Sequence, residues 1–415
     1  MLAASNAPLA PPYPDSMAVT PLSTFGEHTW IYPATWASPN NRDRLLLDFL
    51  GSVRISEDSP SEQIVAVNLS PITDTLLIRQ FKQVVWAALH RSDLLRIDKP
   101  QLIRKPTGVF ALHQALRRLF VAAKWIGCRS LSDLKAGDLE RILLILSPAT
   151  QRISYMLYCF DLISICCRER LVEDGFSTSE KFEIELQREV RDTTASSRYQ
   201  PLSEEQATEV LRISLVYMEL APQMYPMIES LLLNKKNELQ VRQWAIDTLP
   251  CGPMLTAKTP LLKTLVALLH VSSANLIGYH LGTRISEMMS MQSGCVISQD
   301  GEIMIEPSKI LLEYRSYKNS AKAEGMLRRI AVHPYIKYVS DVLDMVNQAC
   351  GRNGGYLFSP PGQKHTYLTN QWNYYIGRFC ALHGLPYSLT SHQWRETVAA
   401  IAVQESWLGK TGHSG

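Results

Sequence analysis

The spacing of apolar residues changes twice along this chain, and those changes limit the folds it can adopt. From about residue 74 to residue 281 apolar side chains recur at every third and fourth position, which predicts helices. Four short runs with strand-like composition follow, at Cys295–Ser298, Glu302–Glu306, Lys309–Tyr317 and Leu327–His333. Asp300-Gly301, between the first two runs, is typical of a hairpin turn. Helical spacing then returns from Tyr335 onward, so we predict a mainly α protein with a small antiparallel β-sheet.

The stretch 187–201 interrupts the helical pattern and predicts a linker. It lacks apolar periodicity and ends at Pro201, after which Ser203–Gln206 matches a capping box that begins a new helix. A chain of 415 residues is too long for one ordinary core. We therefore predict a helical domain over 74–186 and a second domain over 202–415.

Residues 1–73 are predicted to be a flexible arm. The first forty or so are rich in alanine and serine and contain Pro8, Pro11, Pro12, Pro14, Pro21, Pro33 and Pro39. Such a composition is typical of segments that bury too little apolar surface to become ordered. The rest of the arm contains one short helical run, Arg42–Leu50, and one strand-like run, Gln63–Asn68.

Charge and cysteine usage exclude several classes of protein. The formal net charge of +3 permits nucleic acid as a partner without requiring it. The eight cysteines form no C-x-x-C pair, so no zinc site, other metal site or cofactor is expected. The apolar run 261–281 is interrupted by Lys263, His270 and Asn275, and no signal peptide is recognisable. We expect a cytoplasmic protein with no membrane contact.

The stretch Gly278–Met291 contains the first candidate functional residue. Gly282 can end a helix, Thr283 can cap the next one, and Arg284 would then occupy its first position. Backbone N–H groups at such a position favour an anion. Arg284 is therefore either a structural ion-pair partner or a phosphate ligand.

Two further regions concentrate positive charge. Between residues 309 and 337 lie Lys309, Arg315, Lys318, Lys322, Arg328, Arg329 and Lys337, against only Glu313 and Glu324. These cations either contact phosphates or protect a sheet edge from pairing. The predicted helix at 110–126 carries Arg117, Arg118 and Lys124, which either face solvent or contact DNA.

Near the end of the sequence, His392 and Arg395 are three residues apart and would share one helix face. The order of these motifs resembles the tyrosine recombinase (phage integrase) family. The matching segments are Gly282-Thr-Arg284-Ile-Ser-Glu287, which resembles the first catalytic-arginine box, Tyr317-Lys318-Asn319 at the position of the catalytic lysine, and Leu389-Thr-Ser-His392-Gln-Trp-Arg395 as the His-x-x-Arg box. Residues 110–145 are similar to the core-binding domain of that family.

This resemblance implies a fold and a set of roles. It implies a helical (SAM-like) core-binding domain followed by an α+β integrase-type catalytic domain. Arg284 and Arg395 would clamp a DNA phosphate while a tyrosine attacks it. Lys318, or Lys322 if the hairpin register differs, would protonate the leaving oxygen, and His392 would assist. Glu287 would orient Arg284, and His413 is a further candidate in the tail.

The sequence departs from the family in one respect. No tyrosine follows Tyr387, so the expected nucleophile after the His-x-x-Arg box is missing and we expect a C-terminally truncated member. The implied function is site-specific recombination or integration of a mobile element on double-stranded DNA, as a homo-oligomer. The alternatives are a cleavage-deficient integrase that only binds DNA, and a helical interaction protein unrelated to DNA.

Overall fold

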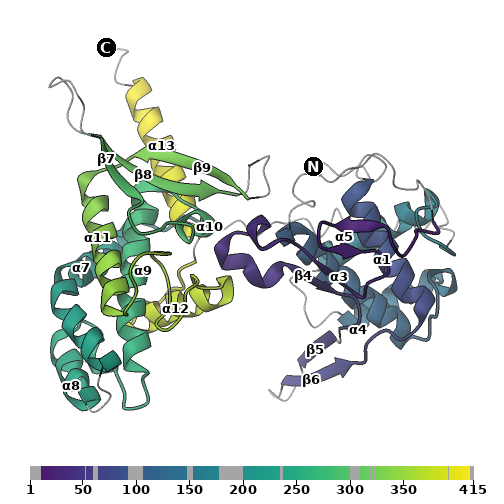
Figure 1. Cartoon of the computed structure of the whole chain (residues 1–415), viewed down its shortest axis with the longest axis horizontal. Helices are drawn as coiled ribbons and strands as arrows, with labels where there is room; N and C mark the ends of the chain where they lie inside the picture. The colour runs from purple at the N-terminus through teal and green to yellow at the C-terminus, as the bar shows by residue number, and fades with distance from the viewer. Residues whose placement is uncertain are drawn as a thin grey trace. The chain divides into compact units, whose positions relative to one another are not determined.

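The computed structural model divides into two compact units, which are described separately (Figure 1). Unit 1 comprises Met1–Ala37 and Asp43–Ser197, and unit 2 comprises Ser38–Arg42 and Arg198–Gly415. The structure describes residues 11–51, 53–58, 64–91, 106–146, 153–176, 200–233, 237–299, 309–317, 320, 324–390 and 392–411. The predicted fold class is confirmed: helices dominate and the strands form small antiparallel sheets.

Helices form most of unit 1. They are α1 (Thr75–His90), α3 (Pro106–Trp125), α4 (Ala136–Leu146) and α5 (Ile153–Arg168), with 3₁₀ turns at Ala34–Trp36 and Leu131–Asp133. The helix expected at 110–126 corresponds to α3. Pro106 begins α3, a position at which the missing N–H of proline costs nothing. The apolar faces of these helices meet in one core.

The prediction that the N-terminal residues form a flexible arm is wrong for residues 11–51. This segment carries strands β1 (Ala18–Thr20), β2 (Ser23–Thr24), β3 (Thr29–Ile31) and β4 (Leu46–Asp48). Tyr13, Phe25 and Trp30 are at most 1% exposed and belong to the same core as α1 and α3. The predicted domain boundary at residue 74 therefore divides a single core.

The physical reason is that the aromatic side chains of this segment bury enough apolar surface to order it despite its many prolines. Each large aromatic ring buries roughly 150–250 Å² on folding, far more than an average residue. The ring centroid of Tyr13 lies 4.4 Å from that of Trp86 on α1, and Trp30 lies 4.6 Å from Phe49. Phe49 in turn lies 4.9 Å from Phe81 on α1, so a row of rings joins the segment to the helices.

The short strands of the segment pair locally. β1 pairs with β2, β3 with β4, and β5 (Val53–Asp58) with β6 (Ile64–Leu69), each pair antiparallel. The strand expected at Gln63–Asn68 is thus confirmed as β6. The helix expected at Arg42–Leu50 is wrong, because Leu46–Asp48 is a strand and only a 3₁₀ segment, Pro39–Arg44, lies beside it. Pairing with β3 decided that conformation, which local spacing could not show.

Unit 2 is built around α9 (Leu261–Leu281), of whose 21 residues 16 are buried. It packs against α7 (Glu204–Leu233), α11 (Pro334–Ala349), α12 (Thr369–Leu382) and α13 (Gln393–Thr411), while α8 (Glu238–Thr248) and a 3₁₀ turn at Gly252–Met254 follow α7. Among the described residues α9 alone is long and apolar enough to cross a membrane, and 89% of its apolar window is buried inside the protein, as in the core helix of a globular unit.

A three-stranded antiparallel sheet, ordered β7-β8-β9, completes unit 2 (Figure 1). Its strands are β7 (Val296–Gln299), β8 (Lys309–Ser316) and β9 (Met326–Ala331), and they follow the one-turn helix α10 (Ile285–Met288). β7 pairs with β8 through Val296↔Leu312, and β8 with β9 through Ser316↔Met326. The strand expected at Glu302–Glu306 and its turn at Asp300-Gly301 lie outside the described residues.

Five residues from the N-terminal part of the chain belong to unit 2. Asn40 is 1% exposed, and its Nδ2 donates to Thr369 Oγ1 at 3.0 Å. Arg42 Nη1 donates to the carbonyl oxygen of Thr366 at 2.7 Å. These contacts fix Ser38–Arg42 to the start of α12, so this short segment interrupts the sequence of unit 1 but belongs to unit 2.

Candidate functional site

Arg284 lies at the sharp turn that joins α9 to α10. Gly282 ends α9 with φ +57°, a left-handed conformation that glycine adopts without strain, as the sequence predicts. The expected role of Thr283 is wrong: Arg284 itself is the residue that precedes α10, with φ −76° and ψ 153°. Because α10 has only four residues, its dipole adds little to anion binding.

Glu287 holds Arg284 in place through two contacts. Its Oε2 accepts from the backbone N–H of Arg284 at 2.9 Å, and its Oε1 accepts from Arg284 Nη1 at 3.2 Å. The Glu287 side chain is 6% exposed and that of Arg284 is 18% exposed. A carboxylate buried this deeply needs hydrogen-bonded cationic partners, which explains the pairing. The resemblance assigned Glu287 an orienting role, and this geometry suits that role.

Two serines join the sheet to the turn that carries Arg284. Ser316 at the end of β8 donates its hydroxyl to Glu287 Oε1 at 2.9 Å. Ser290 Oγ donates to the carbonyl of Glu287 at 2.6 Å and accepts from the backbone N–H of Arg315 at 2.8 Å. The end of β8 is therefore fixed directly beside Arg284. Neither serine stood out in the sequence, because serine at these positions carries no distinctive pattern.

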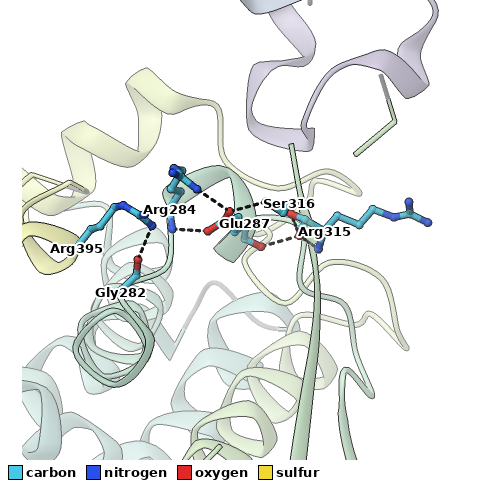
Figure 2. A network of polar contacts seen from close by, with 7 residues as sticks. Gly282, Arg284, Glu287, Arg315, Ser316 and Arg395 are labelled. Carbon is cyan, nitrogen blue, oxygen red and sulfur yellow. Dashed lines mark hydrogen bonds and ion pairs between the residues drawn. The ribbon is translucent and has the colours of Figure 1, made fainter. Parts of the chain in front are cut away.

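Arg395 reaches the same turn from α13. Its Nη1 donates to the carbonyl oxygen of Gly282 at 3.2 Å, and Figure 2 shows its side chain extending toward Arg284. The approach of α13 to α9 depends on Gly278, where a Cβ atom would lie only 3.1 Å from the Trp394 ring. Trp394 Nε1 also donates to Asn275 Oδ1 on α9 at 3.0 Å. In the sequence, the signal for this packing is Gly278-x-x-x-Gly282.

Tyr314 is a part of the site that sequence reasoning missed, and its partner Arg328 is one of the cations predicted to contact phosphates. They are direct cross-strand partners on β8 and β9, on the same sheet face as Ser316, which contacts Glu287. Burial raises the pKa of Tyr314, and the charge of Glu287 raises this pKa further. The guanidinium groups of Arg328, Arg284 and Arg395 act in the opposite direction. With its raised pKa, Tyr314 is a neutral hydroxyl donor near three cations.

The other predicted cations of the sheet lie on its opposite face. Arg315 is exposed, and Figure 2 shows its side chain pointing away from Glu287. Arg329 Nε lies 2.9 Å from Glu313 Oε2, its cross-strand partner. Arg315 and Arg329 are therefore not brought to the Arg284–Arg395 site, although Arg328 is oriented toward it.

The remaining predicted site residues fall into two groups. Lys318, Lys322 and His413 lie outside the described residues. His392 is exposed immediately before α13, and its carbonyl accepts from the backbone N–H of Glu396 at 3.3 Å. It precedes Arg395 by three residues, as required for a shared helix face.

The cations predicted on the helical bundle are engaged inside unit 1. Arg117 Nη2 donates to Gln114 Oε1 at 2.6 Å, and burial lowers the pKa of Arg117 while Asp48 raises it. Lys124 Nζ donates to the carbonyl of Pro71 at 2.5 Å, and Arg118 is half-buried. Their contact with DNA stays a prediction that these placements do not support.

Comparisons with known proteins leave the family open. No family model matches the chain, and no curated protein matches it. Among solved structures the chain is similar to the crystal structure of the XerH site-specific recombinase bound to its difH substrate in a pre-cleavage complex. The identity is 12%, the match covers 84% of this chain and 92% of that chain, and the TM-score is 0.42. Because this similarity is so distant, only the residues of the chain itself indicate its function.

The described parts of the chain hold no group of three or more histidine, cysteine, aspartate or glutamate side chains placed to bind a metal ion. The eight cysteines are unpaired, and six of them are buried. The described side chains at the Arg284–Arg395 site offer guanidinium and hydroxyl donors. Such donors bind oxyanions, and phosphate with two non-bridging oxygens suits two guanidinium groups best.

Proposed function

We propose that unit 2 binds a phosphodiester of double-stranded DNA between Arg284 and Arg395. The observation that carries the proposal is that two arginines far apart in the sequence meet at the Gly282 turn. Arg284 is held by Glu287 and Arg395 by the carbonyl of Gly282. The charges of Arg284, Arg395 and Arg328 and of one carboxylate, Glu287, all act on the Tyr314 hydroxyl, so positive charge is in surplus around it and an anion would balance that surplus.

The alternative, that both arginines are structural, explains Arg284 better than Arg395. Arg284 has a buried carboxylate partner, as a structural arginine requires. The contact recorded for the Arg395 side chain is a single bond to a neutral carbonyl oxygen, within the residues described. A guanidinium group has five N–H donors in a planar fork, so most of those on Arg395 remain available for a ligand.

The proposed reaction is that of the tyrosine recombinase class, which the order of the motifs resembles. In that scheme a tyrosine hydroxyl attacks the phosphorus, the bond to the leaving oxygen breaks, and the two arginines stabilise the charge that develops on the phosphate oxygens. The sequence after Arg395 contains no tyrosine, so the residues named here account for phosphate binding and not for the attack. Lys318, with Lys322 as its alternative, would donate a proton to the leaving oxygen, while His392 and His413 would assist. The same resemblance supports site-specific recombination or integration of a mobile element by a homo-oligomer on DNA. The exposed Arg315 would add nonspecific attraction to the phosphate backbone.

The test is to measure duplex-DNA affinity by fluorescence anisotropy over a range of salt concentrations. Arg284→Ala and Arg395→Ala should each weaken binding about tenfold to a hundredfold, because charge-assisted hydrogen bonds contribute about 1.5–3 kcal/mol. Arg212→Ala is the matched control, since it removes the same charge from an exposed position on α7. Circular dichroism should show that all three variants are folded.

Two outcomes would contradict the proposal. Binding that is absent, or independent of salt, in the wild-type chain would exclude a phosphate ligand. Unfolding of both variants, with Arg212→Ala unaffected, would assign the two arginines a structural role. A nicked suicide substrate then separates strand exchange from binding alone, because only cleavage yields a protein–DNA band that survives denaturant.

A further inference from the structure

A small pocket with a volume of about 20 Å³ is lined by Thr283, Ile285 and Trp394, the sequence neighbours of Arg284 and Arg395. Residues of α9, of the turn before α10, of α12 and of the segment that leads into α13 line it. Its wall is largely apolar, with three polar side chains, Asn275, Thr283 and Thr390. The cavity therefore touches both segments that carry the arginines.

Two hydroxyl groups at this cavity have no hydrogen-bond partner among the described residues. Thr283 is 4% exposed, and within the described parts of the chain its Oγ1 is buried without a hydrogen bond. The same holds for Thr390 Oγ1. Buried hydroxyl groups in folded proteins almost always have a partner, because leaving one unsatisfied opposes folding. Two such groups beside one cavity indicate a shared polar ligand.

Asn275 supplies a third polar atom. Its Oδ1 accepts from Trp394 Nε1 at 3.0 Å, and its Nδ2 donates to Ser214 Oγ at 3.2 Å. An amide oxygen has two lone pairs, so Oδ1 can accept one more hydrogen bond. The cavity thus offers two hydroxyl groups and one acceptor site.

We propose that this cavity holds one buried water molecule that bridges Thr283, Thr390 and Asn275. A water molecule requires a volume of roughly 10–15 Å³ and two to four polar partners, and cavities that stay dry are apolar. The volume of about 20 Å³ is enough for one water molecule. Each threonine hydroxyl then gains the partner that the protein does not supply.

The bridge would position the two arginine-bearing segments relative to each other. Thr283 directly precedes Arg284, and Thr390 precedes the His392–Arg395 segment. Trp394 lines the same cavity and is bonded to Asn275 of α9. Thr283 and Thr390 are therefore positioning residues that act on Arg284 and Arg395 through α9. This consequence for DNA rests on the proposed function, whereas the presence of the water does not.

The primary experiment is a high-resolution crystal structure of the wild-type chain, which requires no variant. Density for one water molecule within hydrogen-bonding distance of both threonine hydroxyls is the expected result. A dry cavity, or two hydroxyls bonded to protein atoms instead, would overturn the proposal.

Valine variants then test the bridge in solution. Thr283→Val and Thr390→Val keep the shape of the side chain but remove the hydroxyl, so each should lower Tm by several degrees. The decrease in Tm of the double variant should be smaller than the sum of the two single decreases, because the second substitution removes a bond to a water that is already weakly held. Thr283→Ser, which keeps the hydroxyl, should retain the bound water and most of the stability. Two results together would contradict the bridge: decreases in Tm that are fully additive in the double valine variant, and a Thr283→Ser variant that loses as much Tm as Thr283→Val.

The DNA readout separates this inference from the proposed function. Both valine variants should bind duplex DNA a few-fold more weakly than the wild-type chain, whereas Thr283→Ser should keep the wild-type affinity. If the water is present and the wild-type chain does not bind DNA, the proposed function fails and the bridge stands. If the cavity is dry and DNA binding depends on Arg284 and Arg395, the bridge fails and the proposed function stands.

Discussion

Lys82 and Lys124 in unit 1 and Arg395 in unit 2 use their side-chain donors in different ways, although Arg352 of unit 2 also binds backbone carbonyls of its own unit. In unit 1, Lys82 is 5% exposed and donates to the carbonyl of Gly26, while Lys124 donates to Pro71. Both lysines thereby hold their own chain together across long sequence separations. In unit 2, Arg395 reaches a single neutral carbonyl at the turn that carries Arg284. A basic residue on a predicted helix therefore indicates a ligand only when the fold leaves its donors unused.

Contacts of this kind also explain why residues 11–51 are ordered, although their composition predicts a flexible arm. Its carbonyl groups at Tyr13 and Gly26 accept from Arg79 and Lys82 of α1, at 3.5 and 3.0 Å. Unit 1 thus uses helix cations and aromatic rings to hold a proline-rich segment. Three measurements, of stability, of its pH dependence and of DNA affinity, test this difference between the units.

The largest effect is expected at Trp30, which is fully buried in unit 1. Trp30→Ala should lower the free energy of unfolding of that unit by about 3–5 kcal/mol, the usual cost of removing a buried tryptophan. Trp125→Ala is the control, because that side chain is 58% exposed and its loss should change stability by less than about 0.5 kcal/mol. Urea denaturation followed by circular dichroism measures both. Equal stability of the two variants would show that residues 11–51 are not part of the core.

A smaller effect is expected from pH, because each unit buries a neutral histidine. Burial, with a contribution from Arg117, lowers the pKa of His113 in unit 1 to about 3. Burial, with a contribution from Arg352, lowers the pKa of His270 in unit 2 to about 3. Between pH 6.5 and pH 3 the unfolded chain binds protons that the folded chain does not, so stability falls as pH falls.

At pH 5 each of these histidines should have cost about 2 kcal/mol of stability relative to pH 7. Unit 2 should lose more than unit 1, because burial also lowers the pKa of His280 and His383 there. Hydrogen exchange measured by mass spectrometry on the whole chain reports on the two units separately. His113→Phe should reduce the pH dependence of unit 1 alone. Opening free energies that do not change from pH 7 to pH 5 would refute this account.

The smallest effect compares one cation from each unit. Arg315→Ala, on the exposed sheet face, should weaken duplex DNA binding a few-fold and reduce the salt slope by about one. Lys124→Met should leave DNA affinity unchanged but lower the stability of unit 1 by about 1 kcal/mol, through its lost bond to Pro71. If Lys124→Met weakened DNA binding at unchanged stability, unit 1 would be restored as a DNA-binding surface.

Local signals in the sequence determined most of the secondary structure. The return of helices after about Tyr335 was expected, as was the end of α9 at Gly282. The position of the sheet was also predicted, since strand and helix periods depend on neighbouring residues. Arg284 and Arg395 were found by their motifs, which are short and local.

Only the tertiary structure decided which side chains act together. It placed Ser316 against Glu287, paired Tyr314 with Arg328 and turned Arg315 to the opposite face of the sheet. It also put Asn40 into unit 2 and Trp30 into the core of unit 1. These facts depend on strand register, on helix crossing at Gly278 and on burial, which bring together residues far apart in the chain. Local sequence signals were therefore sufficient to place most helices, the sheet and the two arginine motifs. Three-dimensional packing brought Arg284 and Arg395 to one turn and joined Lys82 and Lys124 to carbonyl groups of unit 1.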